Sequence, residues 1–315
     1  MLDTVLLFIL TISPLLVILP IIFLPIFIAT SAFKKTEYAK ITNNQYLRTR
    51  SNKGLYGEYL IYSYLKDLNS TQRFLFNVYL PKSNGETTEI DVLLINSSGI
   101  FVFESKNYDG WIFGTESQRQ WTQSMPNGQK NRFYNPIMQN ETHIKWLKSM
   151  LREYDNVPYH SVIAFSNRCT LKKIELNDNK ASVINRNYVR HCVEYTNQQH
   201  KDVLNDEQIQ QIYEKLYPYT QVTEEFKQKH ISDIKNKAVV YTTFPVEAPT
   251  PVIEEPLPLV IETSVSEESV VKKKICSKCG CEMVLRTAKT GENAGKQFWG
   301  CSRFPKCRNA VNVET

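Results

Sequence analysis

Three absences narrow the class of protein before any motif is considered. The 11 glycines among 315 residues exclude a collagen-like chain, and the 22% of charged and 11% of aromatic residues are too ordinary for a chain that is disordered throughout. Seven cysteines are too few for a disulfide scaffold, and their odd number excludes complete pairing within the chain. The length allows roughly two folded domains of ~150 residues each.

Charge of one sign is missing from whole segments, although the net charge of +6 looks ordinary. Residues 1–33 contain a single charged residue, an aspartate, and residues 238–271 contain six glutamates but no lysine or arginine. Positive charge is concentrated in residues 34–53, with six basic residues and one acid, and in residues 272–315, with ten basic and three acidic residues. Residues 54–237 are almost balanced. Each segment therefore implies a different environment.

The N-terminal segment, residues 4–33, is typical of a membrane anchor. It has no charged residue, and thirty residues at ~1.5 Å each exceed the ~30 Å hydrocarbon core of a bilayer. The basic residues that follow in 34–53 predict a cytoplasmic location for the rest of the chain, beside anionic lipid headgroups and with reduced cysteines. We expect a single-pass membrane protein, of the inner membrane in a bacterium, with the bulk of the chain cytoplasmic. A cleaved signal peptide and a hairpin that dips into one leaflet are the alternatives.

The segment IDVLLINSSGIFVFESK predicts a β-hairpin with its turn at residues 96–99. This turn pairs residues whose numbers sum to 195, which places Asp91 opposite Glu104 and Glu89 opposite Lys106. Two opposed carboxylates ~5 Å apart repel each other unless a cation lies between them. Oxygen ligands of this kind suit Mg²⁺ or Mn²⁺, so the hairpin predicts a metal site.

The residue types also suggest a mechanism for cleaving a phosphodiester. Asp91 and Glu104, with the backbone carbonyl of Ser105, would hold one or two Mg²⁺ ions. Lys106 would orient or deprotonate the attacking water and stabilise charge on phosphorus. Glu58, on a helix predicted from residue 53, would either complete the metal site or bind the second ion. The alternative is a solvated hairpin whose edge charges are satisfied by Lys106 and a neighbour.

Two further elements are predicted downstream of the hairpin. A helix that begins at Pro136 places Gln139 and His143 on one face, where they are either structural or in contact with phosphate or with the water at the metal. Residues 160–167 predict a buried strand. The basic residues after it, Arg168, Lys172 and Lys173, either meet backbone phosphates or are ordinary surface charges.

Four segments resemble the NERD (nuclease-related) domain, a family placed in the PD-(D/E)xK superfamily of restriction-endonuclease-like proteins. They are KGLYGE, EID, GIFVFESKNYDGWIFG and NPIMQNETHIKWL, and they span roughly residues 50–170. The resemblance implies an α/β fold for residues 54–237, with a restriction-endonuclease-like mixed sheet flanked by helices. It assigns the catalytic residues of the superfamily to Glu58, Asp91, Glu104, Lys106 and Gln139. Ile90 stands where the superfamily usually has a proline.

The C-terminal part predicts a spacer followed by a zinc-binding module. Residues 238–271 hold five of the 14 prolines and no glycine, so we expect an extended acidic tether. In residues 272–315, two pairs of cysteines have the spacing of a closed tetrahedral zinc site, Cys276-x2-Cys279 and Cys301-x5-Cys307. Cys281 is a fifth thiol that could compete as a ligand. Metal binding would supply the folding free energy of so short a segment.

This module resembles the C4 zinc finger at the carboxyl end of bacterial type IA DNA topoisomerases, apart from Ser277 where that family favours proline. The resemblance implies binding to DNA, mostly single-stranded. The basic residues would contact phosphates and the aromatic residues would stack on bases, although some aromatic side chains must pack around the metal. The candidate DNA-binding residues are Lys278, Arg286, Phe298, Trp299, Arg303 and Phe304.

The sequence therefore predicts a membrane-anchored cytoplasmic nuclease that hydrolyses DNA with Mg²⁺ and captures DNA with its finger. The alternative is a non-catalytic DNA tether that keeps a nuclease-like fold at the membrane, and an RNA substrate is a third possibility. Protein partners are not indicated.

Overall fold

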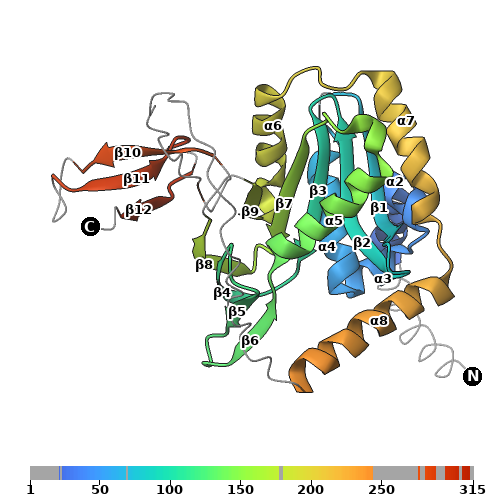
Figure 1. The fold of residues 1–315 in the computed structure, drawn as a ribbon, viewed down its shortest axis with the longest axis horizontal. Helices are drawn as coiled ribbons and strands as arrows, with labels where there is room; N and C mark the ends of the chain where they lie inside the picture. Colours follow the sequence, from blue (N-terminus) through green and yellow to red (C-terminus); the bar gives the residue numbers. More distant parts are fainter. Residues whose placement is uncertain are drawn as a thin grey trace, which may run out of the picture.

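A five-stranded mixed sheet, in the order β1-β2-β3-β7-β9, forms the centre of the molecule (Figure 1). The computed structural model describes residues 21, 23–68, 70–176, 180–243, 276, 281–288, 295–304 and 307–312. Strands β1, β2 and β3 are antiparallel, whereas β3, β7 and β9 run parallel. The five strands span Gln72–Pro81, Thr87–Asn96, Gly99–Lys106, Tyr159–Phe165 and Ala181–Asn185. This architecture confirms the prediction of a mixed α/β fold.

Helices cover both faces of the sheet, and each face has its own apolar cluster. Helices α4 and α6 contribute Ile61 and Val193 to the first cluster, and α5 and α7 contribute Leu147 and Ile212 to the second. Alternation along the strands divides the side chains between the two clusters. The four helices span Lys53–Leu65, Val189–Gln199, Pro136–Met150 and Asp206–Leu216.

Side-chain caps begin the two helices that carry predicted site residues. Asn52 accepts hydrogen bonds from the backbone N–H groups of Gly54 and Leu55 at the start of α4. Asn135 accepts from the N–H of Ile137 at the start of α5, where Pro136 occupies the first turn. The Asn135 amide also donates to the carbonyl groups of Thr115, Glu116 and Gln118, which ties the start of α5 to a segment 17 to 20 residues earlier in the chain.

A second sheet, in the order β6-β5-β4-β8, lies beside the central sheet. Trp121 is fully buried, and its ring stacks on Phe165 of β7 with the centroids 6.1 Å apart. The sequence patterns did not predict this sheet, because its strands are short and mostly polar. The strands are Gly110–Thr115, Gln120–Ser124, Lys130–Tyr134 and Cys169–Glu175.

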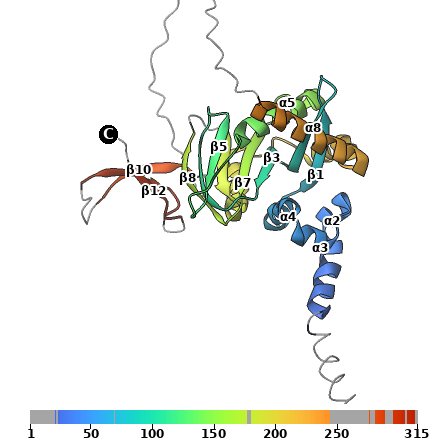
Figure 2. The same cartoon turned by 90° about the horizontal axis from the view of Figure 1, so that it is seen from below.

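The N-terminal helix changes character along its length. Residues 23–34 are helical (Figure 2). Large apolar side chains of this helix, such as Phe23 and Phe27, are exposed. Within the part of the chain that the structure describes, no helix combines the length and the apolarity needed to cross a membrane. Most of the predicted anchor, residues 1–20 and 22, lies outside that part. Phe33 belongs to the folded domain, because it is buried against the rings of Tyr38 and Tyr59.

The domain extends beyond the expected limits of 54 and 237 at both ends. Residues 34–53, expected to be a juxtamembrane segment, form helices α2 (Glu37–Thr42) and α3 (Tyr46–Ser51). Tyr38 and Ile41 of α2 are buried in the core, and this burial makes α2 part of the fold. At the other end, helix α8 (Glu224–Thr243) continues into the expected tether, of which residues 244–271 lie outside the described residues.

The C-terminal module contains a three-stranded antiparallel sheet, β10-β11-β12. Its strands run along Met283–Thr287, Gln297–Cys301 and Ala310–Asn312. Four cysteine side chains and Met283 form a small buried cluster at one end of this sheet. The module therefore has an apolar centre made mainly of sulfur, as expected for a segment that folds around a metal.

Candidate functional site

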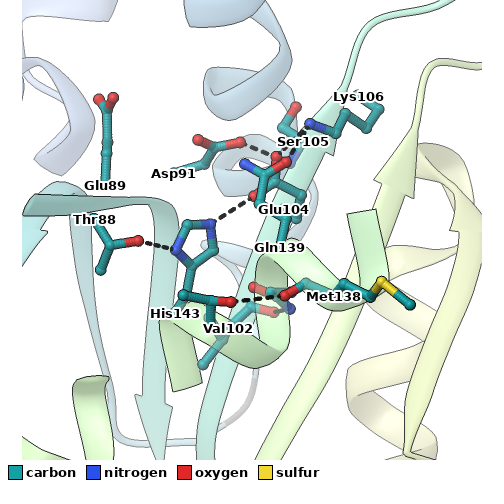
Figure 3. A network of polar contacts seen from close by, with 12 residues as sticks. Thr88, Glu89, Asp91, Val102, Glu104, Ser105, Lys106, Met138, Gln139 and His143 are labelled. Atoms are coloured by element: carbon teal, nitrogen blue, oxygen red, sulfur yellow. Dashed lines mark hydrogen bonds and ion pairs between the residues drawn. The ribbon is translucent and has the colours of Figure 1, made fainter. Parts of the chain in front are cut away.

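The hairpin of β2 and β3 has the predicted register. Val92 pairs with Phe103 and Asn96 with Gly99, so that paired residue numbers sum to 195. Asp91 and Glu104 are the next residues along the two strands, and both lie at the open end of the hairpin (Figure 3). The Asp91 carboxylate accepts a hydrogen bond of 2.7 Å from the backbone N–H of Ser105, which fixes it beside β3.

The strands change their facing at the level of Asp91. Phe76 and Val92 lie in the first apolar cluster, whereas Val78 and Ile90 lie in the second. Strict alternation would place residues two apart on one strand, such as Phe76 and Val78, on the same face. The β1–β2 pairing omits Asn77 and Asp91 themselves, and Asn77 has a left-handed φ of 50°. At this local irregularity the apolar side chains change from one face of the sheet to the other, and Asp91 itself is left out of the β1–β2 pairing.

Glu104 and Lys106 form the centre of a buried polar network (Figure 3). Lys106 Nζ lies 2.7 Å from Glu104 Oε1 and donates a hydrogen bond of 2.9 Å to Gln139 Oε1. His143 Nε2 lies 3.1 Å from Glu104 Oε2, and its Nδ1 lies 2.6 Å from the hydroxyl of Thr88. Gln139 therefore contacts Lys106, and His143 contacts Glu104. The sequence alone did not decide whether His143 lies at the site, and the structure places it there.

Glu58 reaches the same region from the opposite face of the sheet. It is buried, and its Oε2 accepts from Asn77 Nδ2 at 3.1 Å and from the Tyr38 hydroxyl at 3.4 Å. Desolvation, followed by the negative charge of Glu89, raises the pKa of Glu58 to about 7. Glu58 lies close enough to Asp91 for its negative charge to raise the pKa of Asp91.

The carboxylates of the cluster outnumber its cations. Desolvation and the charges of three neighbouring glutamates raise the pKa of Asp91 well above its ordinary value. Burial alone would raise the pKa of Glu104 too, but Lys106 and His143 hold it below the usual range. Lys106 is thereby paired with Glu104, and the raised pKa of Asp91 means that this carboxyl group favours either a proton or an added cation.

This donor set fits a divalent cation with oxygen ligands. Among the described residues, carboxylates do not bring three ligand oxygens within 4.8 Å of one another. Mg²⁺ requires less than that, because it commonly keeps several waters and takes only one or two protein carboxylates. Asp91 and Glu104 on adjacent strands are the residues that would hold it, and Glu58 would face it from α4.

Glu89 does not meet Lys106 as the extrapolated register predicted. Its carboxylate accepts from the Tyr79 hydroxyl at 2.6 Å and lies 3.7 Å from Nε2 of His230. The hairpin pairing ends at Val92, so the register cannot be extended to residue 89. His230 is on α8, and its Nδ1 lies 2.7 Å from the Thr87 hydroxyl. No local sequence signal could have found this contact, which joins residues 143 positions apart.

The finger brings together three of the four predicted zinc ligands. Cys276, Cys301 and Cys307 are buried, and their sulfur atoms all lie within 4.8 Å of one another. The fourth predicted ligand, Cys279, lies outside the described residues. Cys281 is buried but does not belong to the group, and its sulfur contacts His191 of α6. Three clustered thiolates fit a structural zinc ion.

The candidate DNA-binding residues of the finger differ in exposure. Trp299 packs against the cysteine cluster, so part of its ring is committed to the core as expected, whereas Phe304 is 60% exposed. Arg286 pairs with Phe298 across β10 and β11. Arg303 contacts His191, and Lys278 lies outside the described residues.

Comparison with known proteins agrees with this division of the chain. The profile of the nuclease-related domain, NERD, matches residues 53–166, and that of the topoisomerase DNA binding C4 zinc finger matches residues 273–315. No solved structure matches significantly. A protein of Bacillus anthracis, described as uncharacterized, is 33% identical over 187 residues, which cover 59% of this chain and 85% of that relative. The chain therefore carries a nuclease-related domain and a topoisomerase-type C4 zinc finger, and it belongs to the same protein family as the Bacillus anthracis protein.

Proposed function

We propose that this protein is a membrane-anchored, metal-dependent nuclease of the PD-(D/E)xK type that hydrolyses DNA phosphodiester bonds on the cytoplasmic side. The observation that carries the proposal is the buried network at the open end of the β2–β3 hairpin. Asp91 and Glu104 lie there on adjacent strands with excess negative charge, and Lys106 is held beside them. The match to the nuclease-related domain supports the same conclusion.

The protein's own groups would divide the chemistry among them. A bound Mg²⁺ or Mn²⁺ would supply Lewis-acid stabilisation of charge on the phosphate. The Ser105 N–H orients Asp91, and Gln139 with Glu104 holds the Lys106 ammonium in one place. From that position Lys106 would orient the attacking water and stabilise the developing oxyanion. The finger, folded around Zn²⁺, would raise the local concentration of DNA at this site.

Membrane attachment is supported by the exposed apolar helix at the N-terminus. Phe23, Phe27 and Ile28 are more than half exposed, and an apolar surface of this kind marks a site of interaction. We expect the expressed full-length chain to stay in the membrane fraction through a carbonate wash and to be released by detergent. Release by carbonate alone would contradict anchoring, while leaving the proposed chemistry unaffected.

Cleavage of DNA by the full-length chain in detergent tests the proposed chemistry. Single-stranded and double-stranded DNA and RNA are incubated with Mg²⁺ or without added divalent ion, and zinc is left in place. We expect Mg²⁺-dependent cleavage of DNA that falls at least ~100-fold in Asp91→Ala and in Lys106→Ala, as for loss of groups that stabilise a transition state. The exposed ion pair of Lys66 and Asp67 provides matched controls, K66A and D67A, with wild-type activity expected.

Each other outcome has a defined meaning. DNA binding without cleavage of any substrate would contradict the nuclease and support a non-catalytic DNA tether at the membrane. Cleavage that survives both site substitutions would show that the activity lies elsewhere. Preferential cleavage of RNA, lost when the 2′-hydroxyl is removed, would change the substrate and leave the site assignment in place.

A further inference from the structure

Arg186 is a buried cation without an ion pair among the residues that the structure describes. It follows β9, its side chain is only 3% exposed, and its guanidinium makes one described hydrogen bond, from Nη2 to Ser105 Oγ at 3.2 Å. Its Nε is buried and has no hydrogen-bond partner. A buried arginine usually has a carboxylate or several acceptors, because an unsatisfied charged donor is costly. The orphaned donor therefore calls for an acceptor that the protein does not provide.

The position of Arg186 follows from the parallel part of the sheet. Lys106 pairs with Phe165, and Phe165 pairs with Asn185, so β3, β7 and β9 end at one level. Arg186 is the next residue after Asn185, and it lies at the same carboxyl edge as Lys106. In α/β sheets this edge is the usual place for ligands.

Gly57 of α4 leaves the room in which this arginine meets Ser105. A Cβ at position 57 would lie 2.6 Å from Ser105 Oγ and 2.8 Å from Arg186 Nη2, closer than side chains tolerate. Glycine inside a helix costs stability, which is offset only where something needs the space. The KGLYGE segment thus supplies the carboxylate of Glu58 and, at Gly57, the space for the guanidinium of Arg186.

A second arginine, Arg168, lies in the loop after β7, the strand that pairs with β9. It is exposed and donates to Asn107 Oδ1 at 2.9 Å. Its positive charge lowers the pKa of Arg186, in addition to the larger effect of desolvation, so the two guanidinium groups repel each other. Neither forms an ion pair among the described residues. Two like charges held together in this way are stabilised by an anion between them.

We propose that Arg186 and Arg168 form a phosphate-binding site for the nucleic-acid backbone, beside Lys106 at the carboxyl edge of the parallel strands. The proposal deepens the proposed function and rests on it for the identity of the anion. The exposed Arg168 would contact the phosphate from the solvent side, and Arg186 would donate a hydrogen bond to it from Nε. Guanidinium groups bind phosphate with paired, charge-assisted hydrogen bonds, which a buried setting strengthens. The two arginines would hold one phosphate while the carboxylates face the bond that is cleaved.

Binding of thymidine 3′,5′-bisphosphate to the full-length chain in detergent tests the site directly. Titration calorimetry is performed with Ca²⁺ present and with zinc left in place. We expect Arg186→Met and Arg168→Met each to weaken binding by about tenfold or more, the size of a lost charge-assisted hydrogen bond. Arg186→Lys should recover part of the loss. Arg190→Met is the matched control, because Arg190 is a half-exposed arginine paired with Glu194 on α6, and its binding should equal wild type.

The outcomes separate this proposal from the proposed function. Equal affinity of wild type, R168M and R186M would overturn the phosphate site even if DNA cleavage is observed. Arginine-dependent binding by a chain that cleaves no nucleic acid would uphold the site and reject the nuclease. If circular dichroism shows that R186M does not fold, the exposed Arg168 decides, since unchanged affinity in R168M would overturn the proposal and a loss would support it.

Discussion

At the scale of single residues, the site is a network of polar side chains in contact, beside which lies the Asp91 carboxyl group. Thr88, His143 and Glu104 are linked in sequence by contacts of 2.6 and 3.1 Å, and Lys106 closes the chain at 2.7 Å. Among the described residues, Asp91 accepts a hydrogen bond only from a backbone N–H, and its pKa is raised by desolvation and by its acidic neighbours. A metal ion held by Asp91 and Glu104 would complement Asp91, while Lys106 and His143 keep the pKa of Glu104 low.

His143→Leu should destabilise the domain, because it removes the partner of two buried groups. Glu104 Oε2 and the Thr88 hydroxyl would both be left unsatisfied, at a cost of roughly 1–3 kcal/mol each. We expect the free energy of unfolding in urea to fall by about 2–4 kcal/mol, and by about 1 kcal/mol in the smaller change Thr88→Val. A leucine variant as stable as wild type would show that His143 is not holding this network.

His160 should make the stability of the domain depend on pH at the far end of the sheet from the site. Desolvation lowers its pKa, His200 lowers it further, and Nε2 donates to the Ser98 carbonyl at 2.9 Å. The folded state therefore prefers the neutral ring, and the unfolded chain binds a proton first as the pH falls below about 6.5. The free energy of unfolding should decline there as pH decreases. In His160→Gln the decline between pH 7 and 5 should be smaller, and equal slopes in the two proteins would contradict this account.

At the scale of secondary-structure elements, close approach and local irregularity position the site. Helix α4 contributes Gly57 and Glu58 in succession, one providing space and the other a carboxylate. In β1, Asn77 adopts a left-handed conformation and donates to Glu58, so the irregular strand and the helix are joined at one point. These elements are therefore shaped by the site and not only by the apolar core.

Gly57→Ala should be far more harmful than Gly54→Ala in the same helix. The methyl group at position 57 would collide with Ser105 and Arg186, and overpacking of this kind costs typically ~1–3 kcal/mol. At position 54 the nearest atom is 3.3 Å away, the flexible cap Asn52, and alanine favours the helix, so we expect a change within ~0.5 kcal/mol. Urea unfolding of both variants is the measurement. Equal stability of the two would show that the space beside Gly57 is not required.

At the scale of the whole molecule, the finger and the nuclease-related domain contact each other. Tyr188 and Tyr195, before and within α6, pack against the cysteine cluster, and His191 of α6 contacts Cys281 and Arg303. Figure 1 shows the finger strands on the side of the molecule where β8 and β9 lie. Because the five-stranded sheet has apolar clusters of its own, loss of the metal should affect the finger first and leave that sheet folded.

Two cysteine variants should separate the zinc ligands from the fifth thiol. Cys301→Ser removes a member of the sulfur cluster, so the full-length chain should lose its zinc and bind DNA at least ~10-fold more weakly. Cys281→Ser should retain about one zinc per chain, because this sulfur lies outside the cluster. Metal content by mass spectrometry and DNA affinity are measured together. Zinc lost in C281S but kept in C301S would reverse the ligand assignment.

Local patterns in the sequence determined a substantial part of the fold. The turn at residues 96–99 sets the hairpin register, and the two apolar runs that flank it predict β2 and β3. Asn135 and Pro136 mark the start of α5. The paired cysteines predicted the group of three sulfur atoms that could hold a metal ion in the finger. These features depend on neighbours a few residues apart, which a sequence displays directly.

Only the tertiary structure decided which distant residues complete the site. Arg186 meets Ser105 across 81 positions, and His230 meets Thr87 across 143 positions, because sheet order and helix packing bring them together. The face change at Asn77 and Asp91 ended the predicted pairing before Glu89. The second sheet likewise escaped prediction, because its strands carry little apolar alternation of their own. Local periodicity determines elements, whereas the partners of a buried charge depend on how those elements pack.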